Sequence, residues 1–237
     1  MRPYIVINGV SSKTINGLLI QSLPPITKPA IRTEIEEIDG RDGDIVTTLG
    51  YSAYDREILI GLRGDFNIDD IIEYFNQEGE IIFSNEPDKI YKFATYSQID
   101  FERLIRFRTA TVTLHVQPFK TCTEPPIEWS NTESVTIADI NVRNKGNIYS
   151  KPTFIIKGSG NINIYINNKW ILELSLPSTT TAFIDAVNMN ATNTVGDYIN
   201  RQVTGDYSNL IIPVGINQVR VTGNMQKVTI NNYSRWI

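Results

Sequence analysis

The sequence predicts a mainly β protein of two domains, and three observations support this fold class. Segments rich in Val, Ile, Thr, Tyr and Phe recur along the chain, separated by Gly, Pro, Asn or Asp. A stretch at residues 118–132 carries three prolines in a Thr/Glu/Ser setting without apolar periodicity. Beyond it, charged residues become rare and Asn, Thr, Ile and Gly dominate. We therefore expect an N-terminal domain at 1–122, a linker at 123–132 and a C-terminal domain at 133–237.

The first half contains four clear strand patterns. They lie at residues 54–62, 80–83, 91–96 and 108–116. The segment 109–116 alternates most regularly, because every second residue is apolar. We expect Val112, Leu114 and Val116 to face the core. The side chains of Thr111, Thr113 and His115 should then point to the opposite side.

One helix is expected in the first half, at about residues 67–78. Four apolar residues have the spacing of a single helix face: Ile68, Ile71, Ile72 and Phe75. Asn67 fits the N-cap, and Gly79 fits the residue that follows a helix. The N-terminal domain is therefore expected to be β-sandwich-like with one α-helix.

Residues 24–50 are predicted to form an extended arm or a long hairpin. Prolines open the segment, and an acidic alternating run leads to the turn Asp39-Gly40-Arg41-Asp42-Gly43. Gly40 and Gly43 can adopt the positive φ that such a turn needs. Ordering an arm by itself is costly, so we expect it to lie against another chain.

The second half contains many short strand candidates and no convincing helix pattern. The candidates lie at residues 134–140, 152–158, 161–167, 169–175, 181–185, 210–214, 217–222 and 226–232. Turn signals recur about every 8–12 residues, a spacing typical of a β-sandwich.

Composition narrows the class of protein. Of 237 residues, 41% are hydrophobic, which is enough for a packed core. The net charge of −4 gives no basic footprint for nucleic-acid binding. No apolar run approaches the ~18 residues that span a bilayer, and the apolar stretch before Asn8-Gly9 is too short for a signal peptide. We expect a protein made and folded in a cytoplasm.

Residues suited to catalysis or metal binding are scarce. His115 and Cys122 are the only histidine and cysteine, so we expect no catalytic triad, no metal site built from them and no cofactor. The acidic loop at 39–44 lacks the closing Glu of a calcium-binding loop. Carboxylate pairs stay open as a hydrolase alternative, since their spacing is spatial. The candidates in the second half are Asp139, Glu173, Asp185, Asp197 and Asp206.

Aromatic residues of the second half leave a carbohydrate-binding adhesin as the alternative function. Sugars stack on exposed aromatic rings, and six are available: Tyr165, Trp170, Tyr198, Tyr207, Tyr233 and Trp236. We expect most of them to fill the sandwich core instead.

Short motifs occur in a characteristic order along the chain. They are Ile7-Asn8-Gly9, Ile38-Asp39-Gly40-Arg41-Asp42-Gly43, Ser84-Asn85-Glu86-Pro87-Asp88, Asn144-Lys145-Gly146, Gly158-Ser159-Gly160, Pro213-Val214-Gly215 and the closing Tyr233-Ser234-Arg235-Trp236-Ile237. No single motif is specific, but the ordered set covers essentially the whole chain. It resembles the distal tail protein (Dit) family of siphophages and prophages.

The resemblance implies a structural protein and no enzyme. Family members form a hexameric ring that joins the tail tube to the tail tip or baseplate, with a central channel through which DNA passes without specific binding. A C-terminal galectin-like β-sandwich serves as docking platform for adsorption proteins. The implied partners are further copies of the chain, the tail tube protein, the tail-associated or tail fibre protein and receptor-binding proteins. The implied location is the virion tail tip, after assembly in the host cytoplasm and without membrane insertion.

Two sets of residues follow as site hypotheses. The turn Gly40, Arg41, Asp42 and Gly43 would belong to an arm that contacts the next subunit. The acidic residues Glu34, Glu36, Glu37 and Asp39 would partly line the channel, where like charge keeps DNA from sticking. A solvated or intersubunit hairpin face explains them equally well. At 237 residues, the chain has no room for an inserted sugar-binding module, which weighs against the adhesin.

Overall fold

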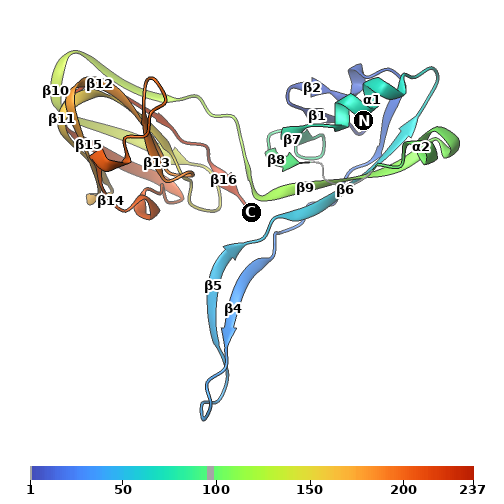
Figure 1. The fold of residues 1–237 in the computed structure, drawn as a ribbon, viewed down its shortest axis with the longest axis horizontal. Helices are drawn as coiled ribbons and strands as arrows, with labels where there is room; N and C mark the ends of the chain where they lie inside the picture. Colours follow the sequence, from blue (N-terminus) through green and yellow to red (C-terminus); the bar gives the residue numbers. More distant parts are fainter. Residues whose placement is uncertain (1, 95–98) are drawn as a thin grey trace. The chain divides into compact units, whose positions relative to one another are not determined.

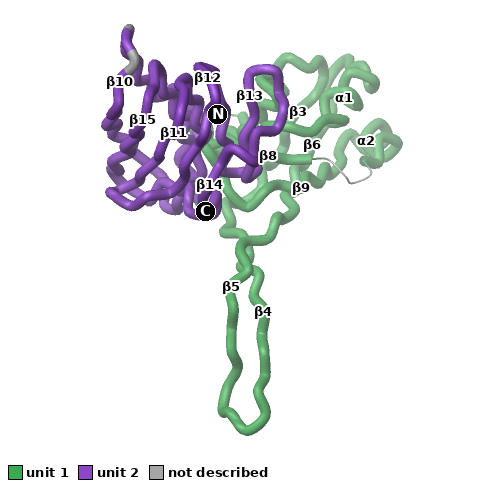
Figure 2. The backbone as a smooth tube through the Cα atoms, turned by 60° about the vertical axis from the view of Figure 1, so that its left-hand side comes forward, with its two compact units in different colours: residues 1–121, 237 green, residues 122–236 purple. Residues whose placement is uncertain are grey.

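The computed structural model describes residues 2–94 and 99–237 and divides into two compact units (Figure 2). Unit 1 comprises Met1–Thr121 together with Ile237, and unit 2 comprises Cys122–Trp236. Both are built mainly from strands, as the sequence predicts. Among the described residues, no helix is long and apolar enough to cross a membrane.

Unit 1 is built on one antiparallel sheet with strand order β2-β1-β7-β8-β9-β6-β3 (Figure 1). Its elements are β1 (Ile5–Ile7), β2 (Val10–Ser11), η1 (Ser12–Thr14), β3 (Leu18–Ser22), β6 (Tyr54–Leu62), β7 (Glu78–Phe83), β8 (Ile90–Ala94) and β9 (Thr109–Thr121). The expected alternation in β9 is confirmed, because Val112, Leu114 and Val116 are fully buried.

The predicted helix is present as α1 (Ile68–Phe75), but its C-terminal end differs from the prediction. Asn67 caps it as expected and accepts a hydrogen bond from the Asp69 backbone N–H at 3.0 Å. The helix does not reach residue 78, because β7 begins there and pairs with β8. Gly79 therefore lies in a strand rather than after the helix.

Position 79 requires glycine because of its backbone conformation and the close approach of another side chain. Its φ is +136°, and a Cβ there would lie 2.3 Å from Asn8 Oδ1. Asn8 reaches across to this strand: Oδ1 accepts from the Glu80 N–H at 2.9 Å, and Nδ2 donates to the Glu78 carbonyl at 3.0 Å. The glycine thus lets an asparagine side chain bridge the start of β7.

A second helix, α2 (Phe101–Phe107), was not predicted. Asp100 caps its N-terminus by accepting from the Arg103 N–H at 2.8 Å, and Arg108 ends it with φ +61°. Only Leu104 of the helix is buried. Phe101, Leu104 and Ile105 do have helical spacing, but a stripe this short was not recognised in the sequence.

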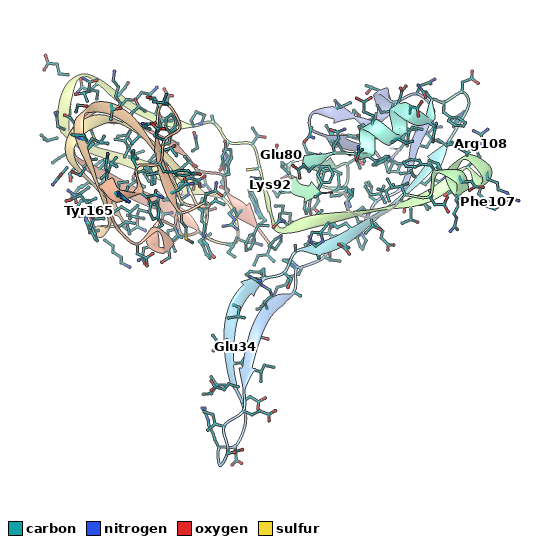
Figure 3. All side chains as sticks on the ribbon, viewed as in Figure 1. Glu34, Glu80, Lys92, Phe107, Arg108 and Tyr165 are labelled. Carbon is teal, nitrogen blue, oxygen red and sulfur yellow. The ribbon has the colours of Figure 1, made fainter. Side chains whose placement is uncertain are left out.

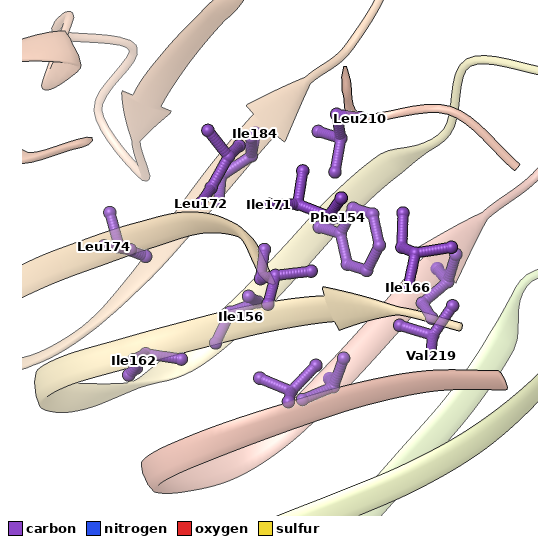
Figure 4. Close-up of a cluster of buried hydrophobic side chains, with 14 of the residues drawn as sticks. Phe154, Ile156, Ile162, Ile166, Ile171, Leu172, Leu174, Ile184, Leu210 and Val219 are labelled. Carbon is purple, nitrogen blue, oxygen red and sulfur yellow. The ribbon is translucent and has the colours of Figure 1, made fainter. Parts of the chain in front are cut away.

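Unit 2 has a sheet with strand order β10-β15-β11-β12-β13, and β14 pairs with β12. The elements are β10 (Ile127–Asn144), β11 (Thr153–Ile166), β12 (Lys169–Asp185), β13 (Asn190–Asn193), η2 (Asn200–Gln202), β14 (Val203–Gly205), η3 (Tyr207–Asn209), β15 (Gly215–Asn231) and β16 (Arg235–Trp236). Buried aliphatic side chains and Phe154 from along these strands form one core (Figure 4).

The strands of unit 2 are longer than predicted. Expected strands 152–158 and 161–167 form the single strand β11, because the turn signal at 158–160 is an irregularity in pairing rather than a chain reversal. Residues 127–132, assigned to the linker, lie in β10, where Ile127 and Trp129 pack against the core. Expected strand 210–214 is absent as such, and Ile212 makes only an isolated bridge to Ser150.

Candidate assembly surface

The predicted arm is a β-hairpin made of β4 (Ile31–Glu36) and β5 (Ile45–Tyr51). The two strands form a sheet of their own, and every residue of β4 is exposed. Figure 3 shows the hairpin with Glu34 on it, and side chains of the unit 1 sheet do not cover it. A strand pair exposed to this degree is unusual, since an isolated hairpin is marginally stable in water.

The tip of the hairpin contains the turn with positive φ angles that its two glycines predict. Gly40 and Gly43 have φ of +81° and +76°, which confirms the predicted turn. The Arg41 N–H donates to the Ile38 carbonyl at 3.1 Å, and Arg41 and Asp42 are exposed. Contact of this turn with another subunit stays a prediction.

The hairpin presents two chemically different faces. Thr33 pairs with Thr48 and Ile35 with Val46, so these four β-branched residues share one uncharged face. Glu34 and Glu36 alternate with them and therefore lie on the opposite face, where they pair with Thr47 and Ile45 of β5. Ile35 is 60% exposed and Val46 is 59% exposed. We call the face with Thr33, Ile35, Val46 and Thr48 the apolar face of the hairpin, and the face with Glu34 and Glu36 the acidic face.

The four candidate channel residues lie on or next to this hairpin. Glu34 and Glu36 are in β4, and Glu37 and Asp39 lead into the tip. All four are exposed, and none has an ion-pair partner within the described part of the chain. Their orientation toward a channel stays a prediction.

The residues considered for catalysis are dispersed and engaged in local structure. His115 Nδ1 lies 2.7 Å from Asp55 Oδ1 on the neighbouring strand β6. Asp139 binds Arg220 at 2.7 and 3.2 Å, while Asp185 accepts from the backbone of the turn after β12. Residues 2–94 and 99–237 contain no cluster of three or more metal-ligating side chains.

The six candidate aromatic residues of unit 2 do not fill its core, contrary to our expectation. The six candidates are half-buried or exposed, and only Tyr207 packs against the edge of the aliphatic core. Trp170 is held at the surface by its Nε1–H, which donates to Asn163 Oδ1 at 2.9 Å.

A groove of about 330 Å³ lies on the unit 2 sheet, on the face that points away from the core. It is lined by Pro126, Glu128, Ile155, Lys157, Thr181, Lys227, Thr229 and Asn231. None of these residues is aromatic, so the groove offers no ring on which a sugar could stack.

A buried polar cluster in unit 1 was missed by the sequence reasoning. Arg56 is 3% exposed in β6, and the ion pair between Lys120 Nζ and Glu86 Oε1 at 2.5 Å is also largely buried. The signal was present, since Arg56 occupies a core-facing place in the alternation with Ile58 and Ile60.

No family model matches the chain, and no curated protein sequence matches it. Among solved structures, the chain is similar to SPP1 Dit, described as a paradigm of the hub adsorption apparatus in phages that infect Gram-positive bacteria. That likeness has a TM-score of 0.69 at 16% identity and covers 100% of both chains.

The chain is also similar to a chain of the phage P2 baseplate in its activated conformation with Ca, with a TM-score of 0.51 at 11% identity. This likeness covers 98% of the present chain and 97% of the other. In its fold, the chain is therefore similar over its whole length to SPP1 Dit, as the order of its motifs predicted.

Proposed function

We propose that this chain is a structural component of a phage tail hub that forms a homo-hexameric ring at the virion tail tip. The observation that carries the proposal is the likeness of the whole fold to a Dit protein. The scarcity of catalytic groups agrees with a role in assembly rather than in chemistry. The ring joins the tail tube protein to the tail-associated or tail fibre protein and surrounds a channel for DNA.

The hairpin is the proposed contact between neighbouring subunits. A surface that meets a different surface on the next copy makes a heterologous contact, and such contacts close into a ring when the rotation fits. The apolar face of the hairpin gains burial from this contact, because Ile35 and Val46 are more than half exposed in the single chain. Unit 2 then serves as the docking platform for adsorption proteins.

The test is the assembly state of the full chain with and without the hairpin. In the deletion variant, a short Gly-Ser bridge replaces residues 31–51; this is geometrically mild because the Ser52 N–H already donates to the Ala30 carbonyl at 2.8 Å. Light scattering and electron microscopy should show rings for the parent chain, alone or with its tail partners, and none for the deletion variant.

A matched control changes two exposed apolar residues of unit 2, Val195 and Tyr198, to Ser. This variant should still form rings. A parent chain that stays monomeric and binds neither tail-tube nor tail-associated protein would contradict the proposal.

A further inference from the structure

The root of the arm, Pro24-Pro25, is bound to the sheet of unit 1 at two consecutive carbonyls. Asn85 Nδ2, from the turn between β7 and β8, donates to the Pro24 carbonyl at 3.2 Å. Arg56 Nη2, from β6, donates to the Pro25 carbonyl at 2.7 Å. Two bonds from different elements fix the direction of a segment as well as its place.

The segment held in this way is stiff. Each proline ring locks its own φ near −65°, and the residue before a proline is restricted to extended backbone. Beyond the prolines, the Ser52 N–H and the Ala30 carbonyl join the two limbs of the hairpin. On the returning limb, the ring of Tyr51 packs edge-on against Phe119 at 5.3 Å. A direction set at Pro25 is therefore carried into the hairpin.

Arg56 is held in an aromatic cage. Its guanidinium carbon lies 4.6 Å from the ring centre of Tyr91, 5.1 Å from that of Phe83 and 5.7 Å from that of Tyr54. Nε and Nη1 have no hydrogen-bond partner among the described residues. The ring faces attract the cation, and the bond from Nη2 to Pro25 is directed at the arm.

The nearby carboxylate of Glu86 is already engaged. It binds Lys120 Nζ at 2.5 Å and accepts from the Tyr91 hydroxyl. Burial raises the pKa of the Tyr91 phenol, and the hydrogen bond to this carboxylate raises it further. Arg56 has no carboxylate partner within 4 Å in the described part of the chain.

We infer that Arg56 is a positioning residue for the arm: the cage of Tyr54, Phe83 and Tyr91 aims its guanidinium at the Pro25 carbonyl and so sets the direction in which the hairpin leaves the sheet. Burying a cation with unbonded N–H groups costs stability, and an apolar residue of similar volume is often neutral or stabilising at such a place. What the arginine supplies is the bond to the arm. This role concerns the single chain and does not depend on ring formation.

The experiment measures arm direction and stability separately. Cys122 is the only cysteine, so in a Cys122→Ser background spin labels at Thr48→Cys on the hairpin and Glu80→Cys on β7 report one intramolecular distance. Labelled chain is diluted with unlabelled chain, so contacts between copies do not contribute. The variants are Arg56→Met and Arg56→Gln. The control is Arg108→Met, whose guanidinium also lies over a ring, that of Phe66, at 4.9 Å.

Arg56→Met should broaden the distance distribution about twofold while the melting temperature stays equal or rises. Arg108→Met should leave the distribution unchanged. A folded Arg56→Met variant with the parent distribution would overturn the inference, whether or not its stability fell. Should Arg56→Met not fold, Arg56→Gln decides, because it also removes the guanidinium that bonds Pro25 but keeps a polar group in the cage. A parent-like distribution in that variant would then overturn the inference. Rings are not measured, so failure of the proposed function leaves this result intact.

Discussion

At the scale of single residues, Tyr74 ties α1 to the first strands of unit 1. It is 3% exposed, and its hydroxyl donates to the Val10 carbonyl at 3.1 Å. Burial raises the pKa of this phenol well above its ordinary value of 10.0. The folded chain therefore keeps a proton that the unfolded chain loses above pH 10, so the stability linked to this group is full below pH 10 and falls as the pH rises toward the raised pKa.

We expect Tyr74→Phe to flatten the loss of stability above pH 10, measured as the free energy of unfolding in urea at a series of pH values. Part of the pH dependence of the unfolding free energy should remain in this variant, because the phenol pKa of Tyr91 is raised as well. The control Tyr233→Phe changes a tyrosine that is 47% exposed and should leave the slope as in the parent. An unchanged slope in Tyr74→Phe would contradict this account.

Asn8 combines a positive φ of 46° with hydrogen bonds that hold the start of β7. We expect Asn8→Ala to lower the free energy of unfolding by about 2 kcal/mol, because it loses these bonds and leaves Ala with a left-handed backbone. The matched control is Asn168→Ala, also at positive φ (65°), which should cost less because the Asn168 side chain bonds to none of the residues that the structure describes. Equal losses in urea titrations would show that the side-chain bridge contributes nothing.

At the scale of elements, the hairpin allows the effect of a substitution on assembly to be measured apart from its effect on folding stability. All of β4 and the middle of β5 are exposed, so changes at these positions should alter folding stability by only about 0.5 kcal/mol or less. The two faces differ in chemistry, which makes their roles in assembly separable.

We expect the pair Ile35→Thr and Val46→Thr to weaken ring formation at unchanged melting temperature. Threonine keeps the β-branched shape but reduces the apolar area that a neighbour can bury. The comparison pair is Glu34→Gln and Glu36→Gln on the acidic face, which should leave rings intact if the apolar face makes the contact. Light scattering across a concentration series measures both, and the opposite ranking would assign the contact to the acidic face.

The elements also show where sequence reasoning succeeds and where it fails. Strong local signals were sufficient for the hairpin, for α1 and for the alternation of β9. The end of α1 was misplaced because pairing of β7 with β8 overrides the signal of Gly79. The sequence predicts two strands on either side of Gly158-Ser159-Gly160, where the structure has one. The reason is that glycine and serine are common both in turns and at irregularities within a strand. Arg56 needed tertiary information, since its cage comes from three strands.

At the scale of the whole molecule, the chain has two separate hydrophobic cores. Leu114 is fully buried in the core of unit 1 and Phe154 in that of unit 2. We expect Leu114→Ala to cost about 2–5 kcal/mol and Phe154→Ala about 3–5 kcal/mol, each within its own unit. Amide hydrogen exchange should show lost protection in unit 1 for the first variant and in unit 2 for the second. Loss of protection across both units from either change would show that the cores unfold together.

The place of the hairpin in the chain has a consequence for how such proteins can diversify. The strands that flank it, β3 and β6, are hydrogen-bonded neighbours, with Leu18 opposite Leu62 and Ile20 opposite Ile60. The chain thus leaves and re-enters the same sheet between adjacent strands, and the register there does not depend on what lies between. Doubling the length of such an insertion costs only about 0.6 kcal/mol in loop-closure entropy. The sheet of unit 1 therefore tolerates arms of different length, and the contacts of the arm rather than the closure of the sheet set what length is useful.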